Sequence, residues 1–93
     1  MKPSILNTEP GVCFICERQT ETALHHIYGG AKRKMSDKNG FTVFLCPDCH
    51  QYAPHAVHRC RETAEKLKAV CQKAYEETHD RDDFMALVGK NYL

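Results

Sequence analysis

Several features that would place a chain in a broad class are missing from this sequence. Its 93 residues contain no apolar run long enough to span a membrane or to form the core of a secretory signal peptide. They contain no internal repeat and no low-complexity tract, and neither sign of charge dominates, because 13 Lys and Arg stand against 12 Asp and Glu. We therefore expect a cytoplasmic protein with no membrane partner. The net charge by itself does not indicate binding to nucleic acid.

The short length of the chain is a second constraint. A chain of this size forms one domain that buries only about two thirds of its unfolded surface, so its apolar core is thin and a staple would help it to fold. Cysteine is the residue type that can supply the staple, and there are six. In a reducing cytoplasm, such cysteines are more often metal ligands than disulfides.

The spacing of four cysteines predicts a zinc site. Cys13 and Cys16 form one Cys-x-x-Cys pair, and Cys46 and Cys49 form a second pair about thirty residues later. Each turn brings two sulfurs to one side of a tight loop, and two such turns complete the tetrahedral four-thiolate site of a structural zinc. A single pair would also be compatible with buried apolar thiols or with a redox dithiol. The second pair favours zinc.

Sequence periodicity predicts an α+β fold in three parts, which are a loose N-terminal arm (1–12), a zinc-containing core (13–58) and a C-terminal helical brace (60–93). Within the core, residues 20–28 alternate in the manner of a short strand, and 41–45 are rich in aromatic and β-branched residues. We expect these strands to pair as an antiparallel hairpin, joined by a polar, basic loop over 31–40.

Three helices are expected after the hairpin. Pro47 suits the first position of a short helix to Tyr52, which Pro54 ends. The clearest element covers 60–79, where a stripe recurs at helical spacing through Cys60, Ala64, Leu67, Cys71 and Ala74.

We interpret Cys60 and Cys71 as core residues, and a helix this long can also support a dimer. The last helix is expected to start near Asp80 or Asp82 and to stop at Gly89. Its inward-facing residues would be Phe84, Leu87 and Val88.

Histidines near the second cysteine pair supply the pattern that bears on function. His25 and His26 are adjacent at the end of the first strand, and His50 directly follows Cys49. Neighbouring residues of a regular strand point to opposite faces, so either one ring faces inward or the backbone bends there. The order over 13–58 is Cys-x-x-Cys, His-His-Ile, a glycine-containing loop, a strand, and Leu-Cys-Pro-x-Cys-His with a further histidine downstream. It resembles the HNH endonucleases of the ββα-metal fold, in particular the small zinc-bound versions common in phages and prophages.

The resemblance implies a role for each histidine of the pattern. The position of His25 is a divalent-metal ligand in the family, and that of His26 is the general base that takes a proton from the attacking water. His50 matches the second metal ligand, and His58, or alternatively His55, would be the third. The working ion would be Mg²⁺ or Mn²⁺, although a site made mainly of imidazoles binds Zn²⁺, Ni²⁺ or Co²⁺ more tightly.

One position departs from the family pattern. An asparagine usually stands five residues before the Cys of Leu-Cys-x-x-Cys, where this chain has Phe41, and the nearest asparagine is Asn39. In the family this asparagine tethers the loop behind the catalytic histidine. The departure is compatible with a looser active site, with a substitute tether, or with a degenerate domain that still binds DNA.

Basic residues follow the double histidine directly. Lys32, Arg33 and Lys34 lie where they would contact DNA phosphates. From the resemblance we expect a metal-dependent endonuclease that hydrolyses phosphodiester bonds in DNA, acting in the bacterial cytoplasm if it is phage-encoded. The alternatives are a catalytically inactive, zinc-stabilised module that binds nucleic acid or protein, and a phage adaptor or inhibitor that reuses the same scaffold.

Overall fold

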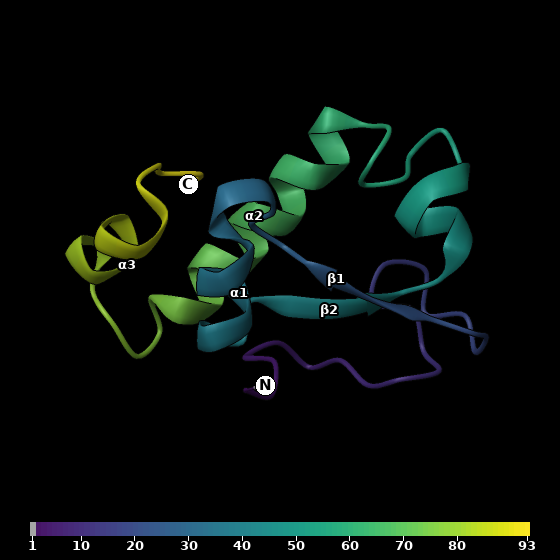
Figure 1. Cartoon of the computed structure of the whole chain (residues 1–93), viewed down its shortest axis with the longest axis horizontal. Coiled ribbons are helices and arrows are strands. Elements are labelled where there is room, and N and C mark those ends of the chain that lie inside the picture. The colour runs from purple at the N-terminus through teal and green to yellow at the C-terminus, as the bar shows by residue number, and fades with distance from the viewer. Residues whose placement is uncertain (1) are drawn as a thin grey trace.

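Two short strands, paired antiparallel, lie at the centre of the molecule (Figure 1). They are β1 (Ala23–His26) and β2 (Thr42–Leu45), and His26 is opposite Thr42 in their register. The computed structural model describes residues 2–93 and confirms an α+β class with one two-stranded sheet and several helices. Among these residues, no helix combines the length and the apolar character needed to cross a membrane.

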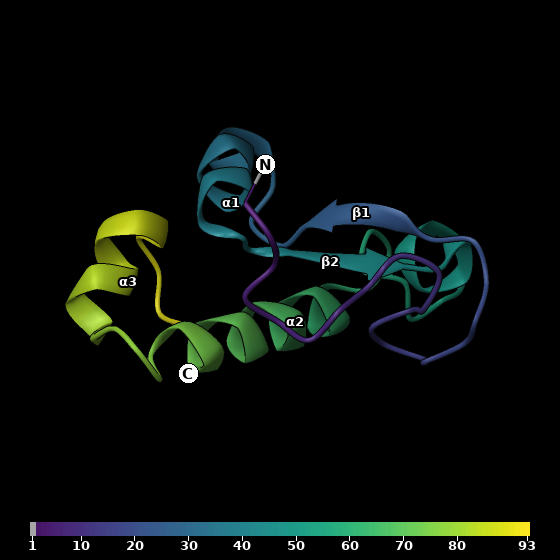
Figure 2. The same ribbon diagram turned by 90° about the horizontal axis from the view of Figure 1, so that it is seen from below.

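The apolar core fills the space between this hairpin and α2 (Arg61–Tyr75), which runs alongside it (Figure 2). Side chains alternate along a strand, so Val43 and Leu45 of β2 share one face with Phe41, the residue before the strand. All three are fully buried. From α2, Leu67 and Cys71 close the core. Burial of each large apolar side chain contributes about 1.5–3 kcal/mol, so this set dominates the stability that packing supplies.

The segment expected to be a polar loop contains a helix instead. Residues Gly30–Lys32 form a short 3-10 turn (η1) that leads into α1 (Arg33–Asn39). The inward-facing residue of α1 is Ser36, which is fully buried. Its Oγ donates a hydrogen bond to the carbonyl of Tyr28 at 2.7 Å and accepts one from the Tyr28 N–H at 3.1 Å. These two hydrogen bonds attach to the turn after β1 a helix that carries no apolar stripe.

The N-terminal segment, expected to be a loose arm, lies along β2. The N–H of Ile5 donates to the carbonyl of Gly40 at 2.9 Å, and the Oγ1 of Thr8 accepts from the N–H of Phe44 at 3.1 Å. Gly40, which ends α1, has φ of 74° and lies so close to Pro3 that a Cβ there would collide with the Pro3 carbonyl. Hydrogen bonds to the backbone, together with the packing of Ile5 and Leu6 against the core, therefore fix a segment that the sequence predicts to be loose.

The long helix α2 is shorter than the predicted range 60–79, and one residue of the predicted apolar stripe does not belong to the core. Cys60 directly precedes α2 and is partly exposed, so its interpretation as a core residue is wrong. Gln72, by contrast, is fully buried. Its Nε2 donates to the Oδ1 of Asn91 at 2.8 Å, and its Oε1 accepts from the N–H of Tyr92 at 2.7 Å. These hydrogen bonds fasten the C-terminal segment to α2.

The last helix, α3 (Arg81–Val88), begins and ends as the sequence predicts. The Oδ1 of Asp80 accepts from the N–H of Asp83 at 2.9 Å, which caps the helix, and Gly89 ends it at a φ of 82°. Two of the three expected inward residues are buried, Phe84 and Val88. The helix lies at one end of the molecule, and η2 (Asp48–Tyr52) lies at the other (Figure 1).

Candidate metal centres

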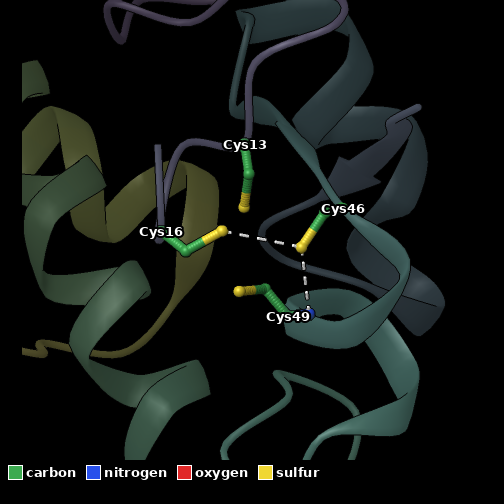
Figure 3. Close-up of side chains that lie close together, drawn as sticks. All are labelled: Cys13, Cys16, Cys46 and Cys49. Atoms are coloured by element: carbon green, nitrogen blue, oxygen red, sulfur yellow. Dashed lines mark hydrogen bonds between the residues drawn. The ribbon is translucent and has the colours of Figure 1, made fainter. Parts of the chain in front are cut away.

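Four cysteine side chains converge where the N-terminal loop approaches the end of β2 (Figure 3). The Sγ atoms of Cys13, Cys16, Cys46 and Cys49 all lie within 4.8 Å of one another. The Sγ atoms of Cys16 and Cys46 are 3.7 Å apart, and the N–H of Cys49 donates to the Sγ of Cys46 at 3.4 Å. The prediction that the two pairs form one cluster is therefore confirmed, and the cluster can hold a metal ion such as zinc.

The first pair is shaped by a tight backbone turn. The N–H of Cys13 donates to the carbonyl of Arg18 at 3.0 Å, and the N–H of Glu17 donates to the carbonyl of Cys13 at 2.9 Å. Glu17 closes the turn at a φ of 63°, in the left-handed region that non-glycine residues rarely adopt. A further hydrogen bond, from the N–H of Phe14 to the carbonyl of Phe44 at 2.9 Å, attaches this turn to β2.

The electrostatics of the four thiols suit a cation. Burial opposes ionisation of Cys13, but the N–H groups of three neighbouring residues point to its sulfur and together lower its pKa to about 6. For Cys49, burial and then the adjacent thiols raise the pKa, so these sulfurs do not all ionise on their own. A bound divalent cation deprotonates coordinating thiols. Four sulfur donors, three of them buried, are the donor set of a structural zinc.

A second cluster consists of His25 from β1, His50 from η2 and His58 from the loop that leads to α2. One ring nitrogen from each lies within 4.8 Å of the others, and the Nε2 atoms of His50 and His58 are 3.0 Å apart. Hydrogen bonds from the N–H of Val57 to the carbonyl of Cys49 (2.9 Å) and from the N–H of His58 to the carbonyl of His50 (3.3 Å) fold the loop back onto η2. The structure thus brings together the three histidines that the resemblance singles out.

The expected short helix after β2 is a single π-helical turn, η2. Its wide hydrogen bond runs from the N–H of Ala53 to the carbonyl of Asp48 at 2.9 Å, five residues back. Pro47 precedes the turn, where no N–H donor is needed, and Pro54 stops its continuation. A π turn is wider than an α-helical one, and such turns are frequent at functional sites. This turn carries one ligand candidate of each cluster, Cys49 and His50.

His55, the alternative third ligand, lies beside the cysteine site rather than in the histidine cluster. Its Nε2 is 3.3 Å from the Sγ of Cys49. The side chain of His58 occupies the position next to His25, with ring centroids 5.1 Å apart. Geometry therefore separates the two candidates, because His58 belongs to the histidine cluster and His55 contacts a sulfur of the cysteine cluster.

The histidine cluster is electrostatically prepared for a cation. Burial, and then the proximity of His50 and His58, lower the pKa of His25 to about 4. Burial and His58 likewise lower the pKa of His50. Because protons on these rings would repel one another, His25 and His50 are neutral at neutral pH. Neutral imidazoles are the form that ligates metal ions, so the donor set fits a divalent ion.

His26 borders the same space as this cluster. A surface cavity of about 280 Å³ is lined in part by His25, His26, His50, His58, Gly30 and Arg33. The side chain of His26 is 16% exposed, so its ring reaches the cavity while being held by its surroundings. Both adjacent histidines line the cavity although both belong to β1, and His26 is the last residue of that strand.

The position that departs from the family pattern belongs to the core. Phe41 is fully buried, with its ring 5.5 Å from that of Tyr28 and 5.4 Å from that of Tyr75. Asn39, the nearest asparagine, donates from Nδ2 to the carbonyl of Met35 at 2.8 Å within α1. Asn39 therefore does not tether His26.

Sequence reasoning missed one residue at the site, Asp37. Its Oδ1 lies 3.1 Å from the Nε2 of His26. The prediction of a loop over 31–40 gave no reason to place Asp37 beside His26. A helical interpretation ended by Gly40 would have placed Arg33 and Asp37 four residues apart on one face, next to the histidines.

The three basic residues that follow the double histidine differ in their surroundings. Arg33 is exposed and lines the cavity. The Nζ of Lys32 instead donates to the carbonyl of Leu87 in α3 at 3.4 Å, and Lys34 is exposed on α1. Of the three, Arg33 has the position best suited to a ligand of the cavity.

Comparisons with known proteins assign no relative to this chain. No protein-family model, no curated protein and no solved structure matches it. The chemistry of the two clusters must therefore be inferred from their own geometry.

Proposed function

We propose that this protein is a metal-dependent DNA endonuclease of the HNH type. The observation that carries the proposal is the convergence of His25, His50 and His58 within 4.8 Å, at a cavity that His26 also lines. The order of the segments, a strand pair followed by a helical turn that supplies His50, is consistent with the resemblance found in the sequence. Three ligand candidates and one nearby unligated imidazole are the minimal parts of a single-metal phosphodiesterase.

In this proposal, His25, His50 and His58 hold the divalent ion. When bound, the ion would polarise the scissile phosphate and stabilise the negative charge on the departing 3′ oxygen. Imidazole donors favour Zn²⁺, Ni²⁺ or Co²⁺ in affinity, whereas Mg²⁺ or Mn²⁺ would be the working ion. The four cysteines hold a separate zinc, whose role is to fix the loop at Cys13 and the turn at Cys49 to one another.

His26 is the general base of the proposed reaction. Its ring accepts a proton from a water molecule as the water oxygen forms a bond to phosphorus. The bond from phosphorus to the 3′ oxygen breaks, and the departing oxygen takes a proton from solvent, so the products are a 5′ phosphate and a 3′ hydroxyl. A positioned base of this kind accelerates such a reaction by about 10²- to 10⁴-fold.

Contact with DNA is assigned to the basic residues beside the cavity. Arg33 is placed to bind a phosphate oxygen near the metal site, and Lys34, on the same exposed helix, adds charge that attracts the backbone. Lys32 contributes less, because its ammonium group faces the carbonyl of Leu87.

A second candidate function is a zinc-stabilised module that binds nucleic acid or protein without cleavage. The observation that favours it is the buried Phe41, which leaves the site without the asparagine that the family uses. This module would keep the cysteine site and the basic surface but would not hydrolyse DNA.

The proposal is tested by incubation of the zinc-containing protein with supercoiled plasmid DNA and either Mg²⁺ or Mn²⁺. We expect nicked and linear products, and a rate at least about 100-fold lower for His26→Ala. The control is His79→Ala, the same substitution at an exposed histidine that stacks on Tyr75, away from the cavity. A DNA mobility shift with no cleavage under any divalent ion would replace the nuclease by the binding module, and full activity in His26→Ala would remove the assigned base.

A further inference from the structure

The contact between His26 and Asp37 joins the end of β1 to α1. The Nε2 of His26 and the Oδ1 of Asp37 are 3.1 Å apart, within hydrogen-bond distance. The His26 side chain is 16% exposed and that of Asp37 is 43% exposed. A single polar contact of this exposure adds little to stability, because water competes for both groups, so its geometry matters more than its energy.

The contact determines which ring nitrogen of His26 carries the hydrogen. An ionised carboxylate only accepts hydrogen bonds, so the Nε2 that faces it must be the protonated nitrogen. In the neutral ring the other nitrogen, Nδ1, is then without hydrogen and can accept one. Among residues 2–93, Nδ1 forms no hydrogen bond of its own, so it is the nitrogen left to meet a ligand. A carboxylate holds the histidine base of other hydrolytic sites in the correct tautomer in the same way.

The backbone around Asp37 holds its carboxylate in place. Its neighbour in sequence, Ser36, is fully buried and exchanges two hydrogen bonds with Tyr28, two residues beyond His26. Both partners of the contact are thus attached to the same short stretch of chain. α1 cannot turn or slide relative to the end of β1 without breaking the hydrogen bonds of Ser36.

We propose that Asp37 is the positioning residue of His26, fixing the ring in the Nε2–H tautomer with Nδ1 turned to the cavity. This inference rests on the proposed function, and it identifies a substitute for the absent asparagine. Asn39 and Phe41 cannot serve, because the first bonds within α1 and the second is part of the core. Asp37 acts only through His26 and is not required to touch the metal or the DNA.

The first experiment reads the tautomer directly and needs no activity. Long-range ¹H–¹⁵N NMR spectra of the ¹⁵N-labelled, zinc-containing chain show which ring nitrogen of each neutral histidine carries hydrogen, and the His26 signals are assigned by their loss in His26→Gln. We expect the Nε2–H form for His26 in the unmodified protein and a mixture of tautomers in Asp37→Ala. An Nδ1–H form in the unmodified protein, or no change in Asp37→Ala, would overturn the inference.

The second experiment separates positioning from folding and from metal binding. We expect Asp37→Ala to lower kcat for plasmid cleavage by about 10- to 100-fold, the range typical of lost outer-shell partners, with KM and the metal concentration at half-maximal rate within about twofold. Asp37→Asn, whose amide oxygen can still accept from Nε2–H, should restore part of this loss. Asp82→Asn, on the exposed start of α3, is the matched control and should change none of these quantities.

The two experiments distinguish failure of the inference from failure of the proposed function. If the unmodified protein cleaves no DNA while the tautomer of His26 depends on Asp37, the nuclease proposal fails and the positioning contact stands. If the protein cleaves DNA and Asp37→Ala lowers only its melting temperature, with kcat and the tautomer unchanged, the contact is structural and the inference is overturned.

Discussion

The four-cysteine site and the three-histidine cluster use adjacent residues of one turn, yet solvent reaches them differently. Cys13, Cys46 and Cys49 are at most 1% exposed and only Cys16 is exposed, whereas in the histidine cluster His50 is partly exposed and His58 is exposed. Closed four-ligand metal sites stabilise folds, and sites with three protein ligands and an open position admit water or substrate. This difference in exposure supports the proposal that the sulfur site is structural and that the histidine cluster carries the chemistry.

The largest expected effect is on folding, from loss of a sulfur ligand. Cys49→Ser should lose the zinc and be largely unfolded at 25 °C, because the binding free energy of a structural zinc, roughly 10 kcal/mol or more in small domains, is comparable to the whole stability of a domain. Circular dichroism and elemental analysis measure both quantities, and the unmodified protein should contain one tightly held zinc.

Cys60→Ser is the matched control for that substitution. Cys60 is outside the sulfur cluster and partly exposed, so this variant should keep both the zinc and the fold. A Cys49→Ser protein that lacks zinc but melts at the temperature of the unmodified chain would contradict a structural role for the metal.

The next effect is on cleavage without loss of the fold. His50→Ala removes a ligand candidate of the open cluster and should lower plasmid cleavage by about 100-fold or more while the protein keeps its zinc and its circular dichroism spectrum. The comparison is sharp because His50 directly follows Cys49 in η2. Unfolding of His50→Ala to the same extent as Cys49→Ser would show that the two clusters are not functionally separate.

The smallest effect is expected at His55, which tests where the boundary between the two clusters lies. Its hydrogen bond to the Sγ of Cys49 would make it an outer-shell partner of a zinc bound there, so His55→Ala should weaken zinc retention by about tenfold in a chelator competition assay. Plasmid cleavage at saturating zinc should be unchanged. A loss of cleavage with unchanged zinc retention would instead return His55 to the list of catalytic ligands.

The part of these sites that could be predicted from the sequence is the part with local geometry. A Cys-x-x-Cys turn brings its two sulfurs together whatever the rest of the chain does, and the hairpin then joins the two turns. The set of His25, His50 and His58 came from the resemblance. The strand register places His25 near η2, and the hydrogen bonds of Val57 and His58 to η2 bring in the third ring.

The missed features depend on hydrogen bonds of buried polar side chains to other segments of the chain. α1 has one buried residue, Ser36, whose hydrogen-bond partners are on Tyr28 in the turn after β1, so no apolar pattern marks the helix. With α1 missed, Asp37 could not be placed beside His26. Gln72 is a similar case, since a polar residue on a helix is expected to face water and this one is fully buried.

The position of Gln72 sets a lower limit to how far the chain can be shortened. Its amide has partners on Asn91 and Tyr92, and removal of these residues would leave it with only the carboxylate of Glu76 as a hydrogen-bond partner. An unsatisfied buried amide costs about 1–3 kcal/mol, and trimming would also remove the Tyr92 ring that packs against Tyr28. Although the final segment has no regular secondary structure, its Tyr92 packs against the core, away from the end of the molecule where η2 contributes to both candidate metal sites (Figure 1).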